Sequence, residues 1–144
     1  MTKPASYYAA CEVGGLIEAR LTWLGSIDDV LGFQRVMNQA FAKAGSRAII
    51  CADWRDVQVL PPVAGDALID LLRSGNGRFV RSGVLLTLEN AVFALQVERL
   101  FREAQNPQRR AFRDPNEMLR WLSEAMTPDE RQRARGFLIE RREG

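Results

Sequence analysis

The residues best suited to chemistry form one charged group, Asp53-Trp54-Arg55-Asp56, at the end of an apolar run. Its two carboxylates are of the type that general acid and base catalysis uses. The chain gives them little support, because it contains no histidine and pairs no nucleophile with a base. Gly75-Asn76-Gly77 follows a predicted helix, whereas a phosphate-binding loop precedes one. We therefore expect that the protein is not an enzyme.

Residues that bind metals are scarce as well. With no histidine and only two cysteines, Cys11 and Cys51, the usual zinc ligand sets are excluded. Both cysteines lie in apolar, strand-like surroundings, which favours small core residues over a disulfide or a reactive pair. The carboxylates show no spacing typical of a metal site. We expect neither a metal nor another cofactor.

Length and composition are those of one globular domain, with 144 residues of which 47% are hydrophobic. No apolar run approaches the ~20 residues of a membrane span, and the first residues lack the apolar core of a signal peptide. We expect a cytoplasmic protein. The net charge of +2 is small and acidic residues are interleaved with the arginines, which argues against nucleic acid as a partner.

The elements beside the charged group follow from hydrophobic pattern. The continuous apolar run 48–52 predicts a strand buried on both faces. Pro61 and Pro62 then open a helix that closes near Ser74. In open α/β sheets functional groups collect at the carboxyl end of such a strand. The segment between strand and helix is therefore the first place to look for a site.

The remaining segments complete an α/β pattern. Residues 6–23 predict a β-hairpin that turns at Gly14-Gly15, since both glycines can take positive φ. Its second strand has one wet or semi-polar face, which bears Glu18 and Arg20. The other predicted elements are a helix from the N-cap Ser26 to about Ala44 with Gly45 as its stop, a strand over 80–88, a helix from 89–90 to 106, an edge strand over 109–113 with its arginines outward, and helices that begin at Asp114 and Thr127.

These elements predict a mixed β-sheet of about five strands with an N-terminal hairpin and parallel crossovers, covered by helices mainly on one face. A C-terminal helical extension follows. Its apolar side, which includes Phe137 and Leu138, either docks weakly on the domain or serves a partner.

The pattern resembles the STAS domain and its SpoIIAA-like relatives, the fold of bacterial anti-sigma factor antagonists. The resemblance rests on AIICADWRDVQVLPPVAGDALIDLL, on GVLLTLENAVFALQVERLF and on RRAFRDPNEMLRWL, and it covers roughly residues 7–126. It implies a STAS-like domain over residues 1–126, with the extension over 127–144. Classical members have a phosphorylatable Ser or Thr at the start of the helix after the central strand. Residues 60–65 contain no hydroxyl, so we expect no phosphorylation switch there.

The resemblance implies a regulatory, signalling role in which the module binds another protein. The residues expected at this surface are Asp53, Trp54, Arg55, Asp56, Pro61, Pro62 and Val63. Two alternatives stay open within this set. The charged residues either bind a partner or form a salt-bridged turn that ends the strand. Trp54 either anchors a partner or covers the sheet edge.

Two further functions remain open. The first is a small-molecule or lipid-binding domain with an apolar pocket between sheet and helices. The second is self-association, for example as a dimer, through the Tyr7-Tyr8 edge or the Phe137-Leu138 face.

Overall fold

The computed structural model describes residues 3–57, 59–74, 77–87, 91–104 and 106–140, apart from the side chains of Leu100 and Ala104. One five-stranded sheet has the order β1-β2-β3-β4-β5, in which β1 and β2 are antiparallel and the other neighbours are parallel. The predicted α/β fold, with a mixed sheet that begins in a hairpin, is confirmed. The strands are β1 (Ser6–Val13), β2 (Leu16–Trp23), β3 (Ile49–Asp53), β4 (Arg81–Leu85) and β5 (Arg109–Phe112).

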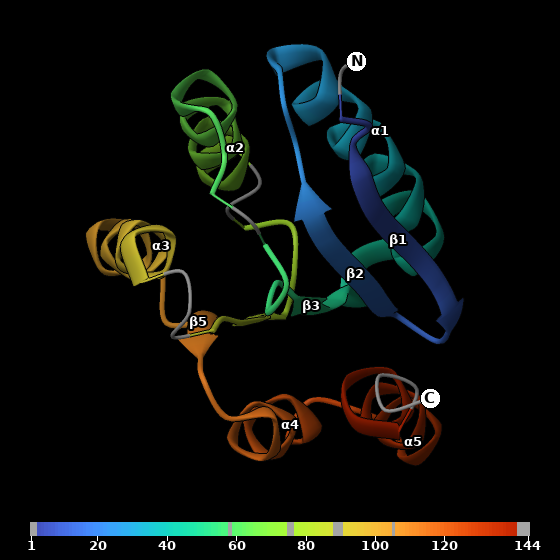
Figure 1. Ribbon diagram of the computed structural model, residues 1–144. Coiled ribbons are helices and arrows are strands. Elements are labelled where there is room, and N and C mark those ends of the chain that lie inside the picture. The colour runs from blue at the N-terminus through green and yellow to red at the C-terminus, as the bar shows by residue number, and fades with distance from the viewer. Residues whose placement is uncertain (1–2, 58, 75–76, 88–90, 105, 141–144) are drawn as a thin grey trace.

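Helices cover both faces of the sheet (Figure 1). Three lie on one face and form the larger layer: α1 (Ile27–Ala44), α2 (Pro62–Ser74) and α3 (Ala91–Ala104). The other face carries α4 (Pro115–Ser123), α5 (Pro128–Arg135) and a π-helical turn, Gly136–Glu140. The described part of the chain contains no helix that is both long enough and apolar enough to span a membrane.

Alternation along the strands divides the core into two clusters, because successive side chains point to opposite faces. Ile17, Ile50 and Val84 pack on the side of α1 to α3. Leu16, Ile49 and Leu85 pack against the apolar residues of the second layer. Since β3 is covered on both sides, all five of its residues are buried, as the continuous apolar run predicts.

The local signals hold where their geometry is described. The Ser26 hydroxyl accepts a hydrogen bond from the N–H of Asp29 at 3.1 Å, and Gly45 ends α1 with φ of 72°. Both bonds of the Thr127–Glu130 capping box are present. The strand predicted over 80–88 is shorter in the structure, since β4 runs only from Arg81 to Leu85. Residue 88, the predicted helix start at 89–90 and the last four residues of the extension lie outside the described residues.

The hairpin turn differs in detail from the expectation. Gly14 has a positive φ of 55°, but Gly15 does not. Gly15 is required for space instead, because a side chain there would collide with the carbonyl oxygen of Arg47. Its N–H donates to the fully buried carboxylate of Glu130 at 2.8 Å. This bond joins the hairpin turn to α5.

The terminal segment docks on the sheet and does not present its apolar side to solvent. Phe137 and Leu138 are buried, so the Phe137-Leu138 face is not available for self-association. The same segment covers the face of β2 that alternation marked as wet or semi-polar. Glu18 is buried there and accepts a hydrogen bond from Arg133 at 3.2 Å, which satisfies its charge. This face is semi-polar, because Glu18 is buried while Arg20 is partly exposed.

Candidate functional site

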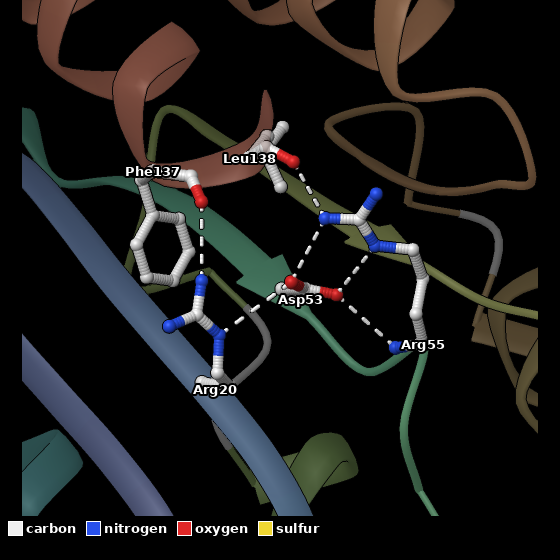
Figure 2. A network of polar contacts seen from close by, with 5 residues as sticks. All are labelled: Arg20, Asp53, Arg55, Phe137 and Leu138. Atoms are coloured by element: carbon white, nitrogen blue, oxygen red, sulfur yellow. Dashed lines mark hydrogen bonds and ion pairs between the residues drawn. The ribbon is translucent and has the colours of Figure 1, made fainter. Parts of the chain in front are cut away.

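The carboxylate of Asp53 is the centre of a charged network at the carboxyl end of β3 (Figure 2). Asp53 pairs in register with Arg20 of β2, and the Arg20 Nε lies 3.5 Å from its Oδ2. Arg55 donates three hydrogen bonds to the same carboxylate, from its backbone N–H at 3.1 Å, from Nε at 2.9 Å and from Nη2 at 3.0 Å. Asp53 is only 1% exposed, so these partners replace the water that its charge would otherwise need.

Arg20 and Arg55 also contact the C-terminal π-helical turn. Arg20 Nη2 donates to the carbonyl of Phe137 at 3.1 Å, and Arg55 Nη2 donates to the carbonyl of Leu138 at 2.6 Å. Arg20 also lies over the ring of Phe137, 4.3 Å from its centroid. The network therefore ties the loop after β3 to the C-terminal turn. The charged residues were expected either to bind a partner or to form a salt-bridged turn that ends the strand. The observed geometry is that of a salt-bridged turn, because the carboxylate of Asp53 is buried.

Trp54 does not have the exposure of a partner-binding anchor. Its side chain is 3% exposed and packs on Phe93 of α3, with the ring centroids 6.0 Å apart. Its backbone N–H donates to the carbonyl of Leu85 at 2.9 Å, which extends the pairing of β3 and β4 by one residue. The indole is drawn into the core because α3 closes over this end of the sheet. Partner contact through Trp54 is the part of the predicted surface that the structure contradicts.

The exposed part of the predicted surface lies farther along the connection. Asp56 and Pro62 are exposed, and Pro61 is half-buried. Val63, in the first turn of α2, is 49% exposed, and Val59, which pattern reasoning did not single out, is 78% exposed. The sequence contains no signal for Val59, because Val57 is also a valine two positions earlier, and only the structure shows that Val57 turns inward. Together, Asp56, Val59, Pro62 and Val63 form what we call the β3–α2 surface.

A small cavity lies between the sheet and helices α1 and α2, in the region where the alternative function placed an apolar pocket, although none of its lining residues had been assigned to a pocket. It has a volume of about 70 Å³ and is lined mainly by apolar side chains. Arg109 of β5 lines it too and is 7% exposed. The arginines of 109–113 were expected to point outward, which holds for Arg110 but not for Arg109. Alternation along β5 turns Arg109 inward, where burial lowers its pKa to about 10.

Arg109 is held by aromatic and backbone groups. Its guanidinium lies 4.8 Å from the ring centroid of Phe79 and 5.4 Å from that of Phe101. Its Nη1 donates to the carbonyl of Leu72 in α2 at 2.6 Å. Within the described residues no carboxylate pairs with Arg109, and its Nε has no hydrogen-bond partner. The indole N–H of Trp54, which also lines the cavity, likewise has no partner among those residues.

Comparison with known proteins supports the fold. No protein-family model matches the sequence, and no curated protein matches it. A solved structure that it resembles is an uncharacterized protein of the DUF3478 family with a SpoIIAA-like fold, from Shewanella loihica PV-4. The likeness has a TM-score of 0.61 at 13% sequence identity and covers 85% of this chain and 98% of the other. The resemblance to the STAS and SpoIIAA-like proteins is therefore confirmed at the level of the fold: this chain has a SpoIIAA-like fold.

Proposed function

We propose that the protein is a non-enzymatic regulatory module of the STAS-like type that binds another protein through the β3–α2 surface. The observation that carries the proposal is the exposure of Val59 and Val63 on a segment that leaves the central strand. Apolar contact area supplies most of the free energy at the centre of an interface, while charges at its rim orient the partner. Asp56, which is exposed, suits the second task.

The surface is held before any partner arrives. At one end Arg55 is fixed by Asp53 and by the carbonyl of Leu138. At the other, the carbonyl of Pro61 accepts hydrogen bonds from the N–H groups of Ala64 and Gly65, at 3.0 and 2.9 Å. A segment fixed at both ends loses little conformational entropy on binding, so more of its contact energy remains as affinity. Arg55 and Asp53 contribute by supporting this surface.

Phosphorylation at the start of α2 cannot control the proposed contact, because residues 60–65 are Leu, Pro, Pro, Val, Ala and Gly. Regulation of this module would then depend on the amount of partner, or on a change elsewhere in the chain. This separates it from the classical members of the fold that it resembles.

The test replaces Val59 and Val63 together by serine and compares the proteins that the wild type and the variant retain from lysates of the expressing cells. Quantitative mass spectrometry identifies a retained partner, and titration with that purified partner then measures the affinity. We expect the double variant to lose at least about tenfold in affinity, which corresponds to ~1.4 kcal/mol. Both valines are exposed, so the free energy of unfolding should change little.

Val80→Ser is the matched control. Val80 is also an exposed valine, but it precedes β4 and therefore lies at the opposite edge of the parallel strands. Sedimentation velocity with the same variants tests whether the partner is a second copy of the chain. Equal retention and equal affinity for the wild type and the Val59 and Val63 double variant would refute the proposed surface.

A further inference from the structure

The cavity beside Arg109 has mainly apolar walls and one buried cation among its lining residues. Apolar side chains from β2, β3, β4, α1 and α2 surround it, among them Ala19, Phe33, Ile50, Ala52, Leu71 and Val84. Arg109 and Trp54 are among its lining residues. Both are buried, and each has a donor with no partner among the described residues.

A buried cation without a carboxylate partner is unusual, because removal of the charge from water is costly unless another group compensates for it. The two phenyl rings and one carbonyl around Arg109 compensate only in part, which agrees with its lowered pKa. Even so, the group is protonated at neutral pH. An anion that enters the cavity would receive charge-assisted hydrogen bonds that the folded chain leaves unmade.

We propose that this cavity binds a short-chain monocarboxylate, with the carboxylate at Arg109 and the alkyl part against Ala52, Ile50 and Phe33. The ligand should be negatively charged because the guanidinium is positive, and it should have an apolar part because most of the lining side chains are apolar. Its size follows from the volume of about 70 Å³, roughly half that of a 150 Å³ cavity that accepts benzene. Acids of two or three carbons suit this space, whereas butyrate already has as many non-hydrogen atoms as benzene and a lipid chain is larger still.

The way in lies between α1 and the segment before β4. Asn38, Phe41 and Arg78 line the cavity and also a shallow surface depression outside it. The Arg78 Nη1 donates to Asn38 at 2.8 Å, and its guanidinium lies 4.1 Å from the ring centroid of Phe41. Both interactions are at the surface, so the side chain can swing away at small cost. Arg78 thus places a second positive charge at the mouth through which an anion would pass.

The experiment titrates the intact chain with acetate, propionate, butyrate and octanoate, and follows backbone amide shifts by NMR. Propionamide and propylamine serve as neutral and cationic ligands of matched shape, and inorganic phosphate as an anion without an apolar part. We expect saturable binding of acetate or propionate, with shifts at residues that line the cavity. Its affinity should exceed that of the matched amide by about tenfold or more, because only the carboxylate carries a negative charge that neutralises the buried guanidinium.

Two variants locate the site. Arg109→Met keeps an unbranched apolar stem without the charge, and it should lower the affinity for the carboxylate about tenfold and the affinity for propionamide by less. Ala52→Val fills the cavity from β3 and should abolish binding of both ligands. The titrations of the wild-type protein with the acids, propionamide, propylamine and phosphate test the proposal even if a variant fails to fold. Failure of both acetate and propionate to bind saturably, equal affinity for propionamide and propionate, or preference for phosphate or octanoate would each overturn the proposal.

Discussion

Replacement of Asp53 by alanine would remove the carboxylate that holds Arg20 and Arg55 together. Breaking a buried ion pair from one side costs about 3–5 kcal/mol when the remaining charge stays buried. Here the side chains of Arg20 and Arg55 are 34% and 19% exposed, so water would solvate them in part. We therefore expect the free energy of unfolding to fall by about 2–3 kcal/mol, and the melting temperature by roughly 6–12 °C.

Replacement of Asp53 should also destabilise the C-terminal turn. Without Asp53 the two guanidiniums are no longer oriented toward the carbonyls of Phe137 and Leu138. Urea unfolding measures the loss in stability, and hydrogen exchange measures the local effect. We expect amides of Gly136–Glu140 to exchange faster in the variant than those of the central strands.

Asp56→Ala provides the control, because this carboxylate is exposed and lies in the same loop. Its replacement should change the free energy of unfolding by no more than about 0.5 kcal/mol. If the Asp53 and Asp56 variants were equally stable, or if exchange at the terminal turn were unchanged, the network would not stabilise the protein in the way described.

Two further predictions follow from buried titratable groups. Burial raises the pKa values of Cys51 and Cys11. We therefore expect a thiol reagent to react slowly with both cysteines of the native protein, and most slowly with Cys51, but to react at once with both in urea. Rapid labelling of Cys51 in the native protein would contradict this expectation. Burial lowers the pKa of Arg109 to about 10, below its value in the unfolded chain. Above pH 10 the unfolded chain therefore binds more protons than the folded one, and the burial of Arg109 becomes less costly as pH rises. Urea unfolding between pH 9 and 11 measures the effect. Above pH 10 the free energy of unfolding of the wild type should rise relative to that of Arg109→Met, by at most ~1.4 kcal/mol per pH unit. If the difference between the two free energies did not change with pH, the effect would be excluded.

Much of the fold could be predicted because its signals are local. Ser26 and Gly45 mark the two ends of α1 by hydrogen bonds within a few residues. The capping box of Thr127 and Glu130 works in the same way. The apolar run 48–52 identified the central strand, displaced by one residue from β3. Such patterns survive in a single sequence since each depends on neighbours along the chain.

The candidate site could be placed but not resolved by the same reasoning. The loop after β3 was identified from the order of strand, charged residues and helix, and Asp56, Pro62 and Val63 are exposed there. Trp54 was ambiguous, because its exposure depends on α3, which covers it with Phe93. Arg109 was assigned to the surface because an arginine at a sheet edge is usually solvated. Nothing near it in the sequence signals the cavity that it lines.

The sequence by itself determined which residues share a face of each element, where most elements begin and end, and which chemistry the residue types exclude. Tertiary structure decided what covers each face. Arg55 meets the carbonyl of Leu138 across 83 positions, and Glu18 meets Arg133 across 115. Periodicity records the side to which a side chain points, since that depends on local backbone geometry. Its burial, its partners and any cavity beside it depend on segments that only folding brings together.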